Sequence, residues 1–208
     1  MIGTKNPAKL NDYKKFFKEL GFKAVCLKDF KITQGVNEDG KTFKENAIKK
    51  AEFYAGLTGL PTIGDDSGLE IDYLNGEPGV KSRRWPGYEA TDEELIGLVL
   101  KKLKGVPWKK RRAQLRAVVA LCLPQKNIFV FQAKTDGCIL EKPTGKLIPG
   151  YPFRSIFYVS KYKKPFAHLT SEEEKAVSHR KKALRKLIKF LQKFYEKDKK
   201  TIENHLTN

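Results

Sequence analysis

Two adjacent carboxylates, Asp65 and Asp66, stand inside a stretch whose pattern is otherwise typical of a β-strand. Apolar residues precede them, Ser67 and Gly68 follow, and an alternating run continues to Asp72. Because neighbouring side chains of a strand point to opposite faces, at least one of the two carboxylates must meet a polar partner. Asp, Ser and Gly are also the usual residues of a tight turn, so a plain turn is the alternative explanation of this stretch taken alone.

A second candidate site lies near the N-terminus, where small polar residues lead into an amphipathic helix. Backbone N–H groups at such a junction are free to bind an anion, and two lysines add positive charge there. The alternative is an ordinary helix start, with Asn6 as the cap and Pro7 at the first helical position. Both interpretations can hold at once, since a helix N-terminus that binds an anion is also capped. The candidate anion-binding residues are Thr4, Lys5, Asn6, Pro7, Ala8 and Lys9.

A third candidate lies in the long C-terminal helix. One broad face of that helix is apolar, yet His179 and Arg180 fall on the same face, with Lys175 at its edge. A buried arginine is costly unless it is paired, so a structural ion pair under the helix is one explanation. The other is a pair of donors for a bound phosphate or for the polar edge of a base. The residues alone leave both open.

The elements that must position these residues alternate between helical and strand-like patterns, which predicts an α/β fold with a mixed sheet. Thr42 and Glu45 have the spacing of a capping box, and the polar loop before them carries Glu38 and Asp39. We expect helices at residues 10–20, 43–57, 91–104 and 170–196. We expect strands at residues 22–33, 61–72, 113–123, 127–133 and 137–141, with a hairpin between 113–123 and 127–133.

Length and composition predict one domain at residues 1–196 and a polar, frayed tail at 197–208. Hydrophobic residues make up 40% of the 208 residues, but no run approaches the roughly 20 apolar residues that span a bilayer. The start also lacks the layout of a secretory signal. The three cysteines are widely spaced and argue against structural zinc and a disulfide framework. We therefore expect a cytoplasmic protein without a membrane partner.

The formal net charge is +18, from 42 Lys and Arg residues against 24 Asp and Glu residues. Such an excess favours polyanions: nucleic acid, a membrane surface or phosphorylated small molecules. Lysines scattered along helix faces are most often solvated surface, however. The charge alone does not select a partner.

Five motifs in one order carry a family resemblance. They are Thr4-x-Asn6-Pro7-x-Lys9, Thr42-Phe43-x-Glu45-Asn46-Ala47-x-x-Lys50-Ala51, Asp65-Asp66-Ser67-Gly68-Leu69-Glu70-Ile71-Asp72, Gly76-x-Pro78-Gly79-Val80-x-Ser82-x-Arg84 and Ala176-Val177-Ser178-His179-Arg180-x-x-Ala183-Leu184. In this order, from about Ile2 to Leu191, the chain resembles the inosine/xanthosine triphosphate pyrophosphatases, the Ham1 family. The resemblance implies an elongated central mixed sheet flanked by helices, and a homodimer.

The same resemblance implies a reaction and a set of roles. The reaction is Mg²⁺-dependent hydrolysis of a non-canonical purine nucleoside triphosphate (ITP, dITP or XTP) to the monophosphate and pyrophosphate. Asp66 would be the catalytic carboxylate and a metal ligand, and Glu38 the second metal carboxylate. The other implied substrate-binding residues are Thr4 to Lys9 and Ser67 for the triphosphate, Tyr151 and Phe153 as a sandwich around the base, His179 and Arg180 on the base side, and Arg84, Pro152, Arg154 and Lys175.

The chain departs from the family pattern at the base side. The aromatic loop of the family reads Gly-Phe-Gly-Tyr-Asp-Pro-x-Phe, whereas this chain has Arg154 in place of the Asp and Pro152 in place of the second Gly. The family's lysine five residues before the histidine falls on Glu174, with Lys175 one position late. An acid and a base have thus exchanged places, as a compensating swap would do.

These departures leave alternatives to the implied function. One is a pyrophosphatase of the same fold with a shifted base specificity. Another is an inactive, basic module that binds nucleotides or nucleic acid, which the net charge suggests. Asp66 and Glu38 argue against the second, because a pure polyanion binder has little use for two carboxylates. We therefore do not expect a nucleic-acid partner.

Overall fold

The computed structural model describes residues 1–206 apart from 20, 22, 126 and 146, and of residues 194–206 it describes only the helical backbone. Within this part of the chain one mixed sheet runs through the molecule, and its spatial order follows the chain order. The first two strands are parallel and all later neighbours are antiparallel. The strands are β1 (Ile2–Gly3), β2 (Thr62–Ile71), β3 (Arg112–Cys122), β4 (Ile128–Ile139), β5 (Phe157–Val159) and β6 (Lys164–Pro165).

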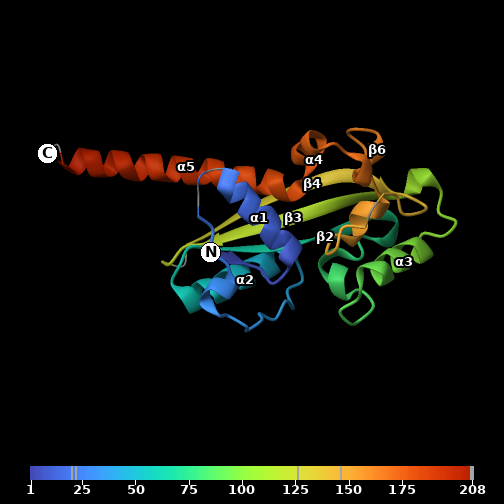
Figure 1. The fold of residues 1–208 in the computed structure, drawn as a ribbon, viewed down its shortest axis with the longest axis horizontal. Helices are drawn as coiled ribbons and strands as arrows, with labels where there is room; N and C mark the ends of the chain where they lie inside the picture. The colour runs from blue at the N-terminus through green and yellow to red at the C-terminus, as the bar shows by residue number, and fades with distance from the viewer. Residues whose placement is uncertain (20, 22, 126, 146, 207–208) are drawn as a thin grey trace.

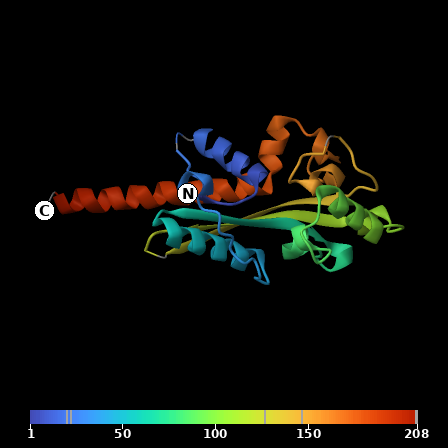
Figure 2. The same cartoon turned by 60° about the horizontal axis from the view of Figure 1, so that its bottom comes forward.

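Helices cover both faces of the sheet. The α-helices are α1 (Pro7–Glu19), α2 (Phe43–Thr58), α3 (Asp92–Lys102), α4 (Ser171–Val177) and α5 (His179–Leu206). Alanines of α2 pack against Val118 and Ala120 of β3 on one face, while α1 and α5 pack against Val119 and Leu121 on the other (Figure 2). Figure 1 shows α5 extending away from the sheet at one end and α3 lying at the opposite end. The predicted elongated mixed sheet with flanking helices is therefore confirmed. No helix in the described residues is both long and apolar enough to cross a membrane.

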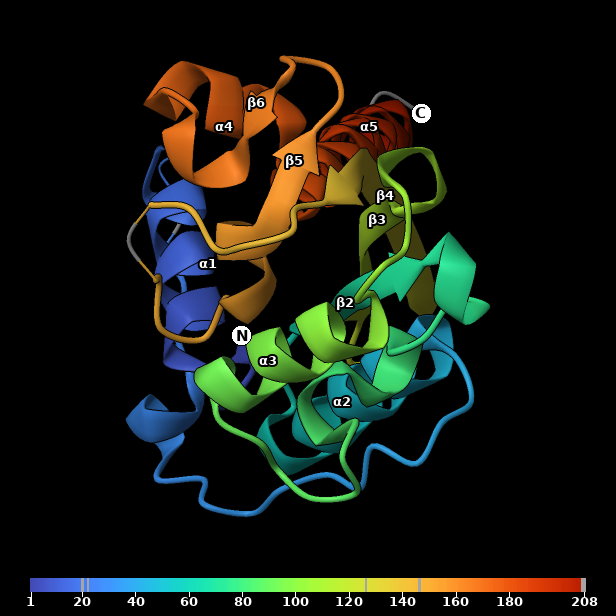
Figure 3. The same ribbon diagram turned by 90° about the vertical axis from the view of Figure 1, so that its right-hand side faces the viewer.

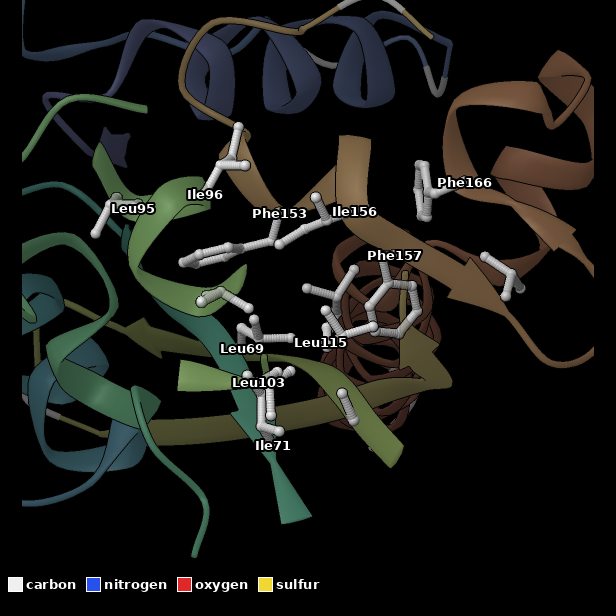
Figure 4. Close-up of a cluster of buried hydrophobic side chains, with 14 of the residues drawn as sticks. Leu69, Ile71, Leu95, Ile96, Leu103, Leu115, Phe153, Ile156, Phe157 and Phe166 are labelled. Atoms are coloured by element: carbon white, nitrogen blue, oxygen red, sulfur yellow. The ribbon is translucent and has the colours of Figure 1, made fainter. Parts of the chain in front are cut away.

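A third apolar cluster lies at the α3 end of the sheet. Leu69 and Ile71 of β2 meet Leu95 and Leu103 from the α3 region in this cluster (Figure 4), together with residues of the short helix η5 (Pro152–Ile156). Because η5 is held by this core, the aromatic loop that precedes β5 has a fixed position relative to β2. One face of β2 thus contributes to two separate cores, through Ile63 at one end and through Leu69 and Ile71 at the other.

Several predicted helix starts are confirmed by their caps. Asn6 Oδ1 accepts hydrogen bonds from the N–H groups of Ala8 and Lys9 at 2.9 and 3.0 Å, and α1 begins at Pro7. Thr42 Oγ1 accepts from Glu45 N at 3.1 Å, as expected for a cap of α2. The predicted reciprocal half is wrong, because the Glu45 carboxylate accepts from Lys41 N at 2.7 Å instead.

Two predicted strands are wrong. Residue 22 of the strand expected at 22–33 lies outside the described residues, and residues 23–33 form no strand: Cys26 makes a single bridge to Ile2, and Leu27–Phe30 is a turn of 3₁₀ helix. Since β1 is only two residues long, it offers no ladder along which a neighbouring strand could extend. The separate strand expected at 137–141 is instead the end of β4, which continues to Ile139.

The predicted C-terminal helix is broken in two. Backbone dihedral angles of −49° and 114° place Ser178 outside the helical region, so α4 ends at Val177 and α5 begins at His179. Ser178 Oγ accepts from Lys181 N at 3.3 Å, and Thr135 Oγ1 donates to the Val177 carbonyl at 2.5 Å. These side chains satisfy the backbone groups that the break exposes. At its other end α5 continues to Leu206, beyond the expected end near residue 196. Residues 207–208 lie outside the described ones, and the fraying of the tail stays a prediction.

Candidate active site

A cleft of about 550 Å³ opens where strand β2 passes between the two groups of helices. Figure 3 shows α1, α4 and α5 on one side of β2 and α2 on the other. Helix α3 packs against Leu69 and Ile71, on the same face of β2 as α1 and α5. The cleft collects nearly all of the predicted site residues from segments far apart in the chain. It is lined by Thr4, Lys5, Asn6, Pro7, Lys9, Glu38, Asp66, Ser67, Arg84, Tyr151, Pro152, Phe153, Arg154, His179 and Arg180.

Two predicted residues do not line the cleft. Ala8 packs near the backbone of Gly150, where a Cβ added to the glycine would lie 3.2 Å from the Ala8 Cβ. Lys175 is 43% exposed in its side chain and lies 3.6 Å from Glu172 of its own helix. The role of Lys175 in substrate binding therefore stays a prediction.

Two glycines flank the carboxylates of β2 and let other elements come close. A Cβ at Gly64 would lie 2.2 Å from the Ala47 carbonyl oxygen of α2. A Cβ at Gly68 would lie 2.3 Å from Ser82 Oγ in the short helix η3 (Gly79–Arg84). Such contacts are impossible for a real side chain, so both glycines are required by packing. The close approach of α2 is what brings its polar side chains within reach of Asp66.

Asp66 faces α2 and the loop before it. Asn46 Nδ2 donates to Asp66 Oδ2 at 3.1 Å, and Lys50 Nζ lies 3.4 Å from Oδ1. The same Lys50 ammonium is 2.7 Å from Glu38 Oε2, so it links the two carboxylates. Burial raises the pKa of Asp66, and although Lys50 and Lys9 oppose this and Glu38 adds to it, the net shift is upward. The cleft therefore contains a carboxylate that is more basic than usual.

Asp65 points to the opposite face and is enclosed by cations. Lys9 Nζ lies 2.5 Å from its Oδ1, while Arg180 Nε and the Tyr13 hydroxyl donate to Oδ2 at 2.9 and 2.8 Å. Burial alone would raise the pKa of Asp65, but Lys9 and Arg180 outweigh it and hold the pKa well below its usual range. Asp65 is 2% exposed and does not line the cleft. It joins α1, β2 and α5 through charge.

Arg180 extends that network to the cleft wall. Its Nη1 donates to the Tyr151 hydroxyl at 3.0 Å and to Asp12 Oδ2 at 3.2 Å, and its Nη2 donates to Ser67 Oγ at 3.0 Å. The Tyr151 hydroxyl in turn donates to Asp12 at 2.5 Å. All three guanidinium nitrogens of Arg180 therefore hold protein acceptors, and the side chain fixes Ser67 and Tyr151 in place.

His179 begins α5 and differs from Arg180, because one of its ring nitrogens has no hydrogen-bond partner. It is 6% exposed, and among the described residues its Nδ1 is the one side-chain nitrogen or oxygen that is both fully shielded from solvent and without a hydrogen-bond partner. Burial lowers the pKa of His179 well below its usual value, and the guanidinium groups of Arg180 and Arg154 lower it further. The imidazole is therefore neutral near pH 7, and His179 is among the residues that line the cleft.

The N-terminal segment and the 34–41 loop close the remaining wall. Thr4 Oγ1 accepts from Asn6 N at 3.2 Å, and Lys5 Nζ donates to the Thr33 carbonyl at 2.6 Å. Arg84 Nη2 donates to the Glu38 carbonyl at 2.8 Å, so η3 holds the loop that carries Glu38. Positive side chains thus surround the cleft mouth on two sides.

The aromatic loop is less open than the sequence suggested. Phe153 is 7% exposed and belongs to the apolar cluster of Figure 4. The guanidinium carbon of Arg154 lies 4.0 Å from the ring centroid of Tyr151. One face of that ring is therefore occupied by a cation, and a base sandwich between Tyr151 and Phe153 stays a prediction.

Sequence reasoning missed residues that the structure places directly behind the carboxylates. Asn46 and Lys50 stand four residues apart on the buried face of α2, a spacing that puts two polar groups on one helix face. That spacing was the available signal. No signal in the sequence pointed to Asp12 and Tyr13, because their roles depend on where α1 lies against α5. Asp92 is similar: its Oδ2 accepts from Gly150 N at 2.7 Å and so ties α3 to the aromatic loop.

The chain is similar to known proteins in both sequence and fold. The model of the Ham1 family matches residues 1–190. The dITP/XTP pyrophosphatase of Geobacter sulfurreducens is 41% identical over 184 residues, which is 88% of this chain and 92% of that protein. The dITP/XTP pyrophosphatase of Halalkalibacterium halodurans is 39% identical over 92% of this chain and 97% of its own length. A Ham1 protein structure from Coxiella burnetii superposes with a TM-score of 0.81 and 36% identity, covering 92% of this chain and 97% of that one.

Proposed function

The chain belongs to the Ham1 family, and from this premise we propose that it hydrolyses non-canonical purine nucleoside triphosphates to the monophosphate and pyrophosphate. The substrates are ITP, dITP and XTP. One observation carries the proposal: Asp66 and Glu38, linked by Lys50, share a single cleft with the cationic segment at the start of α1. A triphosphate needs positive groups for its oxygens, and its hydrolysis needs a base for the attacking water.

The triphosphate lies against the start of α1 in this proposal. Lys5, Lys9 and Arg84 supply positive charge at the cleft wall, and Ser67 Oγ, held by Arg180, lies beside it. Asn6 already occupies the N–H groups of Ala8 and Lys9, so the segment binds phosphate through its side chains and its other backbone groups.

Asp66 acts as the proton acceptor. Its carboxylate takes a proton from the water that attacks the α-phosphorus, and the bond from that phosphorus to the bridging oxygen of the β-phosphate breaks. Burial has raised the pKa of Asp66, which makes the carboxylate a better base than one in water. Asn46 and Lys50 hold its two oxygens in place, and Asp65 on the other face keeps β2 fixed through Lys9 and Arg180.

The donors fit Mg²⁺. Asp66 and Glu38, joined by Lys50, line the cleft together with Glu89, and no group of three or more His, Cys, Asp and Glu gathers as a metal site among the described residues. Mg²⁺ prefers such a site, with one or two carboxylates plus phosphate oxygens and water. Asp66 and Glu38 would hold the ion, whose chemistry when bound is to neutralise phosphate charge and to stabilise the leaving pyrophosphate.

The base lies towards the aromatic loop and the start of α5. Tyr151 and Phe153 contribute aromatic surface, and His179 lines the same cleft. A homodimer and a cytoplasmic location, with no nucleic-acid or membrane partner, complete the proposal. Size-exclusion chromatography with light scattering tests the dimer, and the salt dependence of binding to a labelled oligonucleotide tests the absence of nucleic-acid binding.

A second hollow gives the nucleic-acid alternative a specific place. Basic side chains from β3, β4 and α5 surround a depression of about 560 Å³, away from the carboxylates. It is lined by Arg116, Gln132, Ala133, Lys134, Lys182, Arg185 and Lys186. Under the alternative, an oligonucleotide binds there with an affinity that falls steeply with salt, and mononucleotides compete poorly.

Pyrophosphate release across a panel of triphosphates tests the proposed function. Purified protein is mixed with ITP, dITP, XTP, the four canonical deoxynucleotides and Mg²⁺, and released pyrophosphate is measured with inorganic pyrophosphatase and a phosphate assay. We expect turnover of the three non-canonical purines and little of the others. Equal turnover of all substrates, or none of any, would contradict the proposal.

A further inference from the structure

Arg154 is a buried guanidinium at the wall of the cleft. Its side chain is 8% exposed, and its guanidinium carbon lies 4.0 Å from the ring centroid of Tyr151 and 4.9 Å from that of Phe166. These two rings and the core around η5 fix its orientation. A buried arginine with so little freedom presents its N–H groups in one direction.

The protein uses only part of the donor capacity of Arg154. Nη1 donates to Glu174 Oε1 at 3.0 Å, while Nη2 lies 3.9 Å from Asp12 Oδ2, too far for a hydrogen bond. In the described part of the chain, Nε and Nη2 have no hydrogen-bond acceptor. Both belong to a residue that lines the cleft. The guanidinium is therefore anchored at one nitrogen and has donors left for a ligand.

A guanidinium carries donors only, which restricts the ligand edge it can meet. A 6-oxopurine presents two adjacent acceptors, O6 and N7, and arginine binds this edge with two hydrogen bonds. Adenine presents N7 beside an amino group, whose donors face the donors of the arginine. An arginine at this wall thus favours hypoxanthine, xanthine and guanine over adenine.

We propose that Arg154, oriented by Glu174, is the residue that recognises the O6 and N7 edge of the purine in this chain. The proposal rests on the proposed function of the cleft. The resemblance places an acid at position 154 and a lysine at the neighbouring wall, on helix α4. Here the ion pair is retained with its polarity reversed, so the base-recognising cation comes from η5 and the anchoring acid from α4.

The test is the selectivity between two triphosphates that differ at position 6 of the purine. For each variant, kcat/KM for pyrophosphate release is measured with dITP and with dATP. Their ratio does not depend on the fraction of protein that is folded. We expect Arg154→Met, which keeps the apolar stem against Tyr151, to lower the dITP/dATP ratio about tenfold or more.

Charge reversal tests the polarity of the pair. Arg154→Asp leaves two carboxylates side by side, so we expect it to lower the ratio at least as far as Arg154→Met. The double variant R154D/E174K supplies the cation from α4 and restores most of the lost ratio. Glu172→Lys is the matched control, because Glu172 lies on the same helix, is 82% exposed in its side chain and does not line the cleft. It leaves the ratio unchanged.

The possible results distinguish a failure of the Arg154 proposal from a failure of the proposed function. A wild-type protein that releases no pyrophosphate from dITP contradicts the proposed function. If the wild type is active and Arg154→Met changes the dITP/dATP ratio by no more than about twofold, the proposed role of Arg154 is contradicted and the proposed function still stands. A double variant with a ratio as low as that of Arg154→Asp contradicts the reversed polarity. If Arg154→Asp does not fold, Arg154→Met and the wild type still decide the first two questions.

Discussion

Asp65 and Asp66 are neighbours in sequence, yet the fold places them in opposite electrostatic environments. Asp65 is surrounded by Lys9 and Arg180, which hold its pKa far below the usual range. Asp66 is buried with weaker compensation, and its pKa is raised. The strand alternation puts one carboxylate between α1 and α5 and the other against α2. Two identical neighbours thus have different roles: Asp65 holds the structure together, and Asp66 faces the cleft.

The largest expected effect separates the two residues by activity. Asp66→Asn keeps the shape and the contact to Asn46 but removes the proton acceptor, so we expect pyrophosphate release from dITP to fall about 10³-fold. Because the folded state disfavours the charge of Asp66, the variant should unfold at the same or a higher temperature than the wild type. Near-normal turnover, or a clear loss of thermal stability, would contradict the division of tasks.

Asp65→Asn should give the reverse pattern. It leaves Lys9 and Arg180 buried beside a neutral amide, which costs about 3–5 kcal/mol of unfolding free energy. Urea denaturation followed by circular dichroism measures this cost. Asp136→Asn is the control, because Asp136 is exposed on β4 and its loss should change stability by less than about 0.5 kcal/mol. Equal stability of the two variants would show that Asp65 does not hold the fold.

Gly64→Ala tests how α2 reaches Asp66. The added methyl group meets the Ala47 carbonyl and Ala51 N, so α2 must move away, at a cost of about 1–3 kcal/mol. Since Asn46 and Lys50 move with α2, we also expect a lower kcat for dITP. Gly56→Ala is the matched change on α2 itself, where no atom lies within 4 Å, and it should stabilise the helix by about 0.5–1 kcal/mol. Equal effects of the two changes would contradict the packing argument.

The smallest expected effect is in the pH dependence of stability. The folded-state pKa of Asp65 is depressed, so its contribution is full above its unfolded pKa of about 3.9 and is lost as the pH falls. The folded-state pKa of Asp66 is raised, so its cost is present at neutral pH and disappears as the pH falls. Relative to wild type, Asp65→Asn should therefore lose less stability on acidification and Asp66→Asn should lose more. Urea midpoints across an acidic pH series measure both slopes, and parallel slopes would contradict the opposite shifts.

The general architecture could be predicted because it follows from local patterns. Asn6, Pro7 and the helix start of α1 form a local unit, and the alternation around Asp65 and Asp66 is a property of one strand. The site residues that the resemblance implies all line the cleft, apart from Ala8 and Lys175.

The remaining features depend on tertiary contacts that no local pattern contains. The break at Ser178 interrupts a continuous apolar periodicity, and it is stabilised by Thr135 from a distant strand. The strand expected at 22–33 failed because β1 is too short to pair with it, which is a property of the sheet edge. Likewise, the contacts of Asp12 with Arg180 and Tyr151 join three segments across the whole chain.

Phosphorus NMR of dITP incubated with Mg²⁺ and either wild-type protein or folded Asp66→Asn tests the central claim most directly. The claim is that the carboxylate facing the cleft performs a hydrolysis between the α- and β-phosphates. We predict signals of dIMP and pyrophosphate with the wild type, and intact dITP with Asp66→Asn. Formation of dIDP and phosphate by the wild type, or of dIMP and pyrophosphate at a similar rate by Asp66→Asn, would contradict it.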